Sequence, residues 1–175
     1  MVVSIHTDNP YLPTISIMGF RKGVEKTMSH ALVKLWIHAV FRTKDDSVVI
    51  PPNLQPILNQ QITNILTEQN CKVRIVNSVK DHVHCLFLLS ANASISRVIK
   101  NLKGISSHWI NRENLTPSKF TWQVGYGAFS VSESGVPNVE KYIRNQERHH
   151  QKMTFQEEYD RFMAIYYPEL ISWGR

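Results

Sequence analysis

The sequence has few cysteines and no long hydrophobic segment. Its only cysteines, Cys71 and Cys85, do not form a C-x-x-C pair, and the first 27 residues do not resemble a secretory leader. The longest apolar runs have the length of strands, so none could span a bilayer as a helix. We therefore expect a cytoplasmic protein with reduced thiols and no membrane partner.

Acidic residues are also in the minority. The chain has 20 Lys and Arg against 14 Asp and Glu, a net charge of +6, which favours a polyanion as the binding partner. No P-loop is present, so no nucleotide cofactor is expected. A chain of 175 residues with 42% hydrophobic residues is long enough for one core but short for two.

Sustained patterning begins only at Met28. Residues 1–27 mix prolines, glycines and polar residues without a period, which indicates a flexible N-terminal arm or an over-extended start with Met28 as the true initiator. We expect residues 28–175 to form a single domain.

The pattern from Met28 onward predicts four strands and four helices. Apolar runs predict strands at 32–41, 72–76 and 82–89 and a last one, with its loops, within 120–132. Helical periodicity predicts four helices. The first follows a cap at Asn53 and has Pro56 in its first turn, and the second follows a cap at Ser94. The third covers 137–150, and the fourth begins at the capping box that starts at Thr154. This order is typical of an α/β (α+β) protein with a ferredoxin-like, split β-α-β antiparallel sheet, with helices on one face plus C-terminal helices.

Two histidines alternate within the predicted strand at 82–89. Side chains at i and i+2 leave the same face of a strand about 7 Å apart, so His82 and His84 point together. Taken alone, such a pair is more often two buried histidines than a metal site. Asp81 either orients one of these histidines or finishes the preceding turn, and we favour the turn because on a strand it faces away from both.

The helix predicted over 137–150 changes this assessment. It carries Tyr142 and Gln146 at i and i+4, so a phenol and an amide oxygen share one helical face. A histidine pair lacks a third metal ligand, and a tyrosine and an amide oxygen are then offered together. Neither cysteine is placed as a natural companion of the histidines, which argues against a closed structural zinc site.

These motifs together resemble the single-tyrosine HUH transposases of the insertion sequence 200/605 type and their repeat-associated relatives. The matching stretches are DHVHCLF at 81–87, LKGISS at 102–107, WQVGYGAFSVS at 122–132 and YIRNQERHH at 142–150. The resemblance covers about residues 28–166, and the motifs occur in the expected order.

The resemblance implies a DNA strand transferase that acts on single-stranded DNA with hairpins or repeats. Tyr142 would be the nucleophile and would form a covalent 5′-phosphotyrosine, while His82, His84 and Gln146 would hold a divalent metal. Two nitrogens and one oxygen suit Mg²⁺ or Mn²⁺. The resemblance also implies a homodimer, and it leaves open whether Tyr142 acts in its own subunit or in the partner.

Other residues could take these roles. His149 and His150 lie close enough to Gln146 in sequence to replace it as a ligand. Tyr126, Tyr166 and Tyr167 are alternative nucleophiles, although packing or base stacking is the better interpretation of all three.

Basic residues gather on the two helices that flank these motifs. A solvated face is the simplest interpretation, but phosphate contact is favoured beside a DNA-cleaving helix. Gly104, in the middle of one helix, costs it about 1 kcal/mol relative to alanine, which close approach of DNA or packing against another element would explain. The predicted DNA-binding residues are Arg97, Lys100, Lys103, Arg144 and Arg148.

Two other classes of function remain open. A non-catalytic or domesticated single-stranded nucleic-acid-binding protein could use the same scaffold with a degenerate metal site, and a structural metal protein would bind zinc tightly without cleaving DNA. The sequence does not identify the DNA hairpin, the target sequence or the metal.

Overall fold

The computed structural model describes residues 33–44, 48–146, 157 and 160. The predicted boundary after residue 27 and the helix predicted to begin at Thr154 lie outside these residues. The elements are the strands β1 (Trp36–Arg42), β2 (Lys72–Ser78), β3 (His82–Leu88) and β4 (Gly127–Val131), the helices α1 (Gln55–Glu68), α2 (Ile95–Arg112) and α3 (Val136–Arg144), and a 3-10 turn over Glu133–Gly135.

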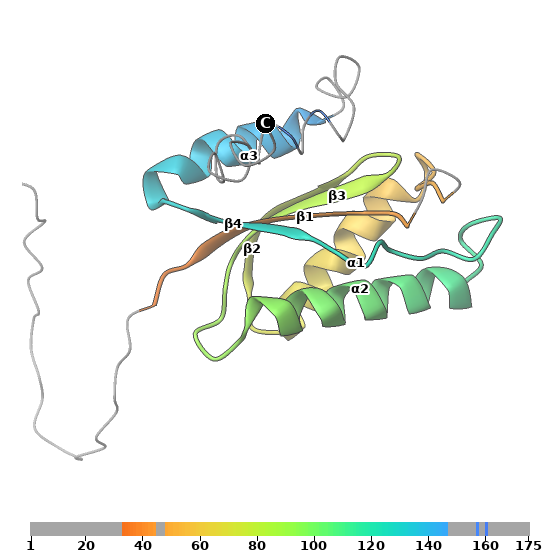
Figure 1. The fold of residues 1–175 in the computed structure, drawn as a ribbon, viewed down its shortest axis with the longest axis horizontal. Coiled ribbons are helices and arrows are strands. Elements are labelled where there is room, and N and C mark those ends of the chain that lie inside the picture. The colour runs from red at the N-terminus through yellow and green to blue at the C-terminus, as the bar shows by residue number, and fades with distance from the viewer. Residues whose placement is uncertain (1–32, 45–47, 147–156, 158–159, 161–175) are drawn as a thin grey trace, which may run out of the picture. The chain divides into compact units, whose positions relative to one another are not determined.

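The four strands form one antiparallel sheet in the order β2-β3-β1-β4 (Figure 1), which confirms the ferredoxin-like arrangement. In this register Val40 of β1 lies opposite His84 of β3, and His38 of β1 lies opposite Phe129 of β4. On the other side of β3, Asn77 of β2 lies opposite His84. Because β1 and β3 are the two inner strands, their side chains have neighbours on both sides.

Alternation along the inner strands sends their side chains to two different layers. Ala39, Phe41 and Cys85 belong to the cluster built with α1 and α2, whereas Leu86 belongs to the cluster built with Val136 and Ile143 at the two ends of α3. Figure 1 shows α1 and α2 on one side of the sheet and α3 on the other. The predicted helices of the β-α-β units therefore share one face, and the first C-terminal helix covers the opposite one.

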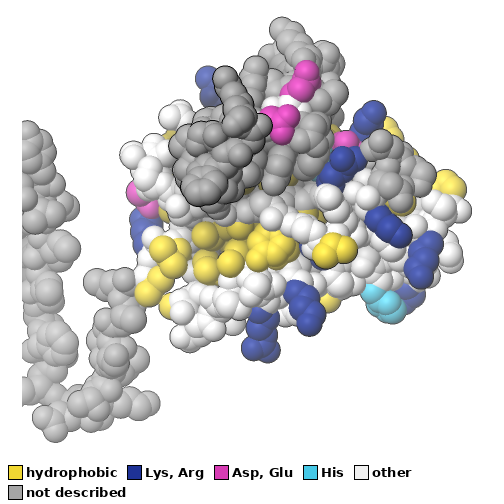
Figure 2. Space-filling model, viewed as in Figure 1, with side chains coloured by type: hydrophobic (Ala, Val, Ile, Leu, Met, Phe, Trp, Pro, Cys, Tyr) yellow, Lys and Arg dark blue, Asp and Glu magenta, His cyan; other side chains and the backbone are white. Residues whose placement is uncertain are grey.

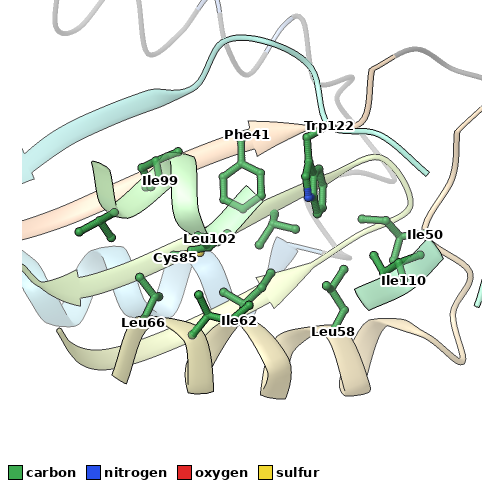
Figure 3. Packing of buried hydrophobic residues seen from close by; sticks show 14 of the residues in the cluster. Phe41, Ile50, Leu58, Ile62, Leu66, Cys85, Ile99, Leu102, Ile110 and Trp122 are labelled. Carbon is green, nitrogen blue, oxygen red and sulfur yellow. The ribbon is translucent and has the colours of Figure 1, made fainter. Parts of the chain in front are cut away.

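The larger core fills the space between the sheet and the first two helices (Figure 3). Leu58, Ile62 and Leu66 of α1 have no exposed surface, in keeping with the predicted i, i+4 stripe. Phe41 packs edge-on against Trp122, with ring centroids 4.8 Å apart. This core anchors the inner strands from one side, so the other side is available for the polar residues of β3 and β1.

The predicted helix starts are correct in one case and wrong in another. Ser94 caps α2 as expected, because its hydroxyl accepts a hydrogen bond from the backbone N–H of Arg97 at 3.4 Å. Asn53 does not cap α1. The cap is Leu54, which makes no side-chain hydrogen bond and already has helical dihedral angles, while Pro56 stands in the first turn as predicted.

The last strand lies within the predicted stretch of 120–132, and the first part of that stretch is loop. β4 begins at Gly127, and before it Trp122 forms only an isolated bridge with Thr43. A Cβ at Gly127 would lie 2.9 Å from Cγ1 of Val40, so the glycine permits close pairing of β4 with β1. None of the helices in the described part of the chain is both long and apolar enough to cross a membrane.

Gly104 and Gly127 give a matched pair of glycine substitutions with opposite expected effects. No heavy atom lies within 4 Å of a Cβ at Gly104, so packing within the described residues does not explain this glycine. Gly104→Ala should raise the free energy of unfolding by about 0.5–1 kcal/mol, because α2 gains helix propensity. Gly127→Ala should lower it by about 1–3 kcal/mol through overpacking against Val40. Urea denaturation measures both; a destabilised Gly104→Ala protein would contradict this account of α2.

Candidate active site

Strand β3 holds His82 and His84 on the face of the sheet that α3 covers. Both imidazoles are fully buried, and their ring centroids lie 5.0 Å apart with planes at 78°. Two imidazoles that bind one cation through nitrogens about 2.1 Å away have ring centroids about 5 Å apart, so this spacing fits a shared ion.

The Nδ1 atom of each histidine is held by a neighbouring side chain. Nδ1 of His82 lies 2.8 Å from Oδ1 of Asp81, and Nδ1 of His84 lies 2.9 Å from Nε2 of His38. The assignment of Asp81 to the turn alone was therefore wrong. Its carboxylate reaches the adjacent ring because Asp81 precedes the strand and is not bound by strand alternation. Any cation shared by the pair would be bound through Nε2 of each ring.

Sequence analysis did not single out His38. This residue lies on β1, is 2% exposed, and stacks on His84 with ring centroids 5.1 Å apart and planes at 24°. Burial first, and then the nearby His84, hold the pKa of His38 well below its ordinary value, so its imidazole is neutral at neutral pH. The available signal was a histidine inside the apolar run WIHAVF, on the strand predicted at 32–41.

Helix α3 carries the predicted nucleophile to the same cluster. The ring of Tyr142 is half-buried and meets His84 edge-on at 5.9 Å between centroids and His38 at 6.2 Å. Both contacts lie within one chain. The phenol ring therefore lies beside His84 and His38 of its own chain.

Two polar contacts fix α3 to the edge strand β2. The side-chain amide of Asn77 donates a hydrogen bond to the main-chain oxygen of Ile143 at 2.8 Å. Glu140 accepts from Nε of Arg74 at 2.6 Å and from Nη2 of Arg144 at 2.8 Å, and these contacts hold the pKa of its carboxyl below the ordinary value. Asn77 lies opposite His84 in the sheet, so the strand that flanks the histidines also positions the tyrosine helix.

Gln146 lies just beyond the end of α3. The structure interrupts the predicted helix at Asn145, whose side-chain amide donates to the carbonyl of Lys141 at 2.9 Å. Asparagine competes in this way with main-chain hydrogen bonds and favours helix ends. The side chain of Gln146 is fully buried. Its predicted role as a ligand stays a prediction, and His149 and His150 lie outside the described residues.

The donor set agrees with a cation bound by nitrogen and oxygen. Cys85 follows His84 directly but points into the opposite core, where burial raises the pKa of its thiol, so it cannot join the histidines. In the described ranges no three His, Cys, Asp or Glu side chains are grouped as a metal site. Two histidines and an amide would not form such a group, so the fit rests on the spacing of the rings and on the partners of Nδ1.

The predicted DNA-binding residues differ in their surroundings. Arg97 and Lys100 are exposed on α2, and the described part of the chain offers their side chains no hydrogen bond or ion pair. The ammonium of Lys103 donates to the carbonyls of Gln123, Val124 and Gly125, all within 3.2 Å, and so ties the loop before β4 to α2. Arg144 is bonded to Glu140, and Arg148 lies outside the described residues.

A groove of about 390 Å³ runs between α2 and the loop before β4. Lys100, Gly104 and Tyr126 are among its lining residues. In Figure 2 Lys and Arg side chains project from the lower edge of the molecule, where Figure 1 places α2, and a hydrophobic strip lies above them. Tyr126 thus belongs to an open groove on the α2 side, which favours stacking or packing for this rival tyrosine.

Comparison with known proteins gives a consistent result. A family profile described as transposase IS200 like matches residues 31–146. A crystallised protein from Deinococcus radiodurans R1, assigned as a transposase, is similar with a TM-score of 0.53 and 23% identity over 73% of this chain and 98% of that one. A REP-associated tyrosine transposase bound to a REP hairpin is similar with a TM-score of 0.54 and 12% identity over 77% of this chain and 74% of that one. No curated protein matches the sequence.

The bond from Asn77 to Ile143 should stabilise the docking of α3. Asn77→Ala should lower the free energy of local opening of α3 by about 1 kcal/mol, because a main-chain oxygen loses its donor. Native-state hydrogen exchange of the α3 amides measures this change. Asn64→Ala on α1 is the matched control, because among the described residues the Asn64 side chain makes a single exposed hydrogen bond, which it accepts from Gln60. Unchanged exchange of α3 in Asn77→Ala would show that the apolar contacts alone hold this helix.

Proposed function

Because the chain belongs to the IS200-like transposase family, we propose that it cleaves and rejoins single-stranded DNA through a tyrosine nucleophile and a divalent metal. The observation that carries the proposal is the position of Tyr142, whose ring lies edge-on to His84 at 5.9 Å. A phenol next to two convergent imidazoles is suited to phosphoryl transfer, because a group that binds the phosphate and a group that attacks it are then adjacent.

The proposed reaction exchanges one phosphoester for another. Oη of Tyr142 loses its proton and bonds to the phosphorus, the bond to the 3′-oxygen breaks, and that oxygen leaves as a 3′-hydroxyl. The phosphotyrosine keeps the ester energy, so attack by another 3′-hydroxyl rejoins a strand and regenerates the phenol. His82, His84 and Gln146 would hold Mg²⁺ or Mn²⁺, which supplies charge stabilisation at the phosphate.

The proposed substrate is DNA with a hairpin or repeat. Support comes from the net charge of +6, from the exposed Arg97 and Lys100 on α2, and from the similar transposase that is bound to a REP hairpin. Arg144 and Arg148 remain proposed phosphate contacts near the nucleophile. The homodimer implied by the resemblance also remains a proposal, and the contact of Tyr142 with His84 of its own chain favours cleavage within one subunit.

A covalent adduct assay tests the nucleophile. Wild-type protein incubated with labelled single-stranded hairpin DNA and Mn²⁺ should give a tyrosine-linked adduct that denaturing electrophoresis resolves. Tyr142→Phe should give none, because the attacking oxygen is absent, and Tyr126→Phe should retain the adduct as the matched control. His82→Ala should lower adduct yield strongly at any Mn²⁺ concentration that saturates the wild type.

The same assay separates the rival functions. A non-catalytic nucleic-acid-binding protein would retard the DNA on native gels in wild type and Tyr142→Phe alike, without any adduct. If cognate hairpins bind but no adduct depends on Tyr142, the enzyme proposal is wrong. A structural metal protein would instead hold zinc tightly and show neither retardation nor adduct.

Salt dependence tests the proposed phosphate contact of Lys100. Lys100→Gln should weaken hairpin binding and reduce the slope of log K against log salt by about one unit, because one fewer counterion is released. Lys103→Gln is the comparison on the same helix. It should increase hydrogen exchange of residues 123–125 with a smaller change of slope, because its ammonium is bonded to their carbonyls. Equal slopes for wild type and Lys100→Gln would remove Lys100 from the interface.

A further inference from the structure

His38 is a buried residue for which the proposed reaction has no role. It stands on β1, diagonal to His84 across the inner strand pair, and lies between the rings of His84, Phe129 and Tyr142. Its Nε2 atom is 2.9 Å from Nδ1 of His84, a bond that only one proton can occupy. The position of that proton decides which nitrogen of His84 can bind a cation.

Two tautomeric arrangements of this pair are possible, and only one permits binding. If Nδ1 of His84 carries the proton and donates it to His38, Nε2 of His84 has a free electron pair for a metal. If Nε2 of His38 carries the proton instead, neutral His84 accepts at Nδ1 and its own proton stands on Nε2, which blocks coordination. The first arrangement requires a neutral His38 with its proton on Nδ1.

We propose that His38 is a positioning residue that holds His84 in the tautomer able to bind the metal. This proposal rests on the proposed function, because it assumes that His84 is a ligand. The two histidines would then be oriented by unlike acceptors, a carboxylate of Asp81 for His82 and a neutral imidazole for His84.

The stacking contact of His38 must be separated from its hydrogen bond. His38→Phe keeps an aromatic ring against both His84 and Tyr142 but removes the acceptor. His38→Gln keeps an acceptor near the former Nε2, because the glutamine amide reaches as far along the side chain. His38→Asn carries the same amide one methylene short of that position. The Gln and Asn variants therefore differ only in whether the acceptor reaches Nδ1 of His84.

Binding of Mn²⁺ alone, without DNA, is the first measurement. Titration followed by the electron paramagnetic resonance of free Mn²⁺ should show affinity about 10- to 100-fold weaker in His38→Phe and His38→Asn than in the wild type, the usual range for loss of a ligand's partner. His38→Gln should stay within a few-fold of the wild type. Urea denaturation of all four proteins reports whether any change of affinity only follows a change of stability.

Nitrogen-15 NMR of the His84 ring is the second measurement. With Mg²⁺ present, the wild type and His38→Gln should carry the His84 proton on Nδ1, and the two other variants should lose this preference. Affinity in His38→Phe equal to that of the wild type, or a His84 proton on Nε2 in the loaded wild type, would overturn the inference alone. Failure of the wild type to bind Mn²⁺ or form the Tyr142 adduct would instead overturn the proposed function.

Discussion

The arrangement of the site depends on the alternation of side chains along β3. Val83, Cys85 and Phe87 enter the core beneath the sheet, and this burial leaves His82 and His84 no orientation except the opposite face. A shift of register by one residue would place both imidazoles in the apolar core and the thiol of Cys85 beneath α3. The hydrophobic layer with α1 and α2 therefore determines on which face of the sheet the histidines lie.

Fully buried imidazoles require partners, and the partners follow from the same geometry. A polar ring removed from water without a hydrogen bond loses about 1–3 kcal/mol, so inner-strand histidines persist only where neighbours satisfy them. Asp81 serves His82 from the start of the same strand, and His38 serves His84 from the adjacent strand. The need for these partners explains why a third histidine lies in the apolar sequence of β1.

Local patterns were sufficient for the fold, and they were insufficient for contacts between distant segments. Strand and helix periods predicted the sheet, and the i, i+2 spacing placed His82 and His84 on one face. The role of His38 depends on the register of β1 against β3, and this register cannot be predicted from the local propensities of the two strands. The interruption of the helix at Asn145 is a different case, because the side chain of Asn145 bonds to the carbonyl of Lys141, whereas Gln146 is helical again and residues 147–150 of the predicted helix lie outside the described residues. Lys103 was predicted to contact DNA because of its charge. In the structure its ammonium donates three hydrogen bonds to the loop before β4.

The position of Tyr142 depends both on a local sequence pattern and on contacts between distant segments. Its place on an amphipathic helix is local, but its contact with His84 requires α3 to dock on the sheet through Ile143 and Asn77. Asn77 lies opposite His84, so the strand that holds α3 is bonded directly to the strand that holds the histidines. A displacement of β2 relative to β3 would therefore move the phenol with respect to the imidazoles. The edge strand, which carries none of the reacting groups, thus sets the distance on which the proposed attack depends.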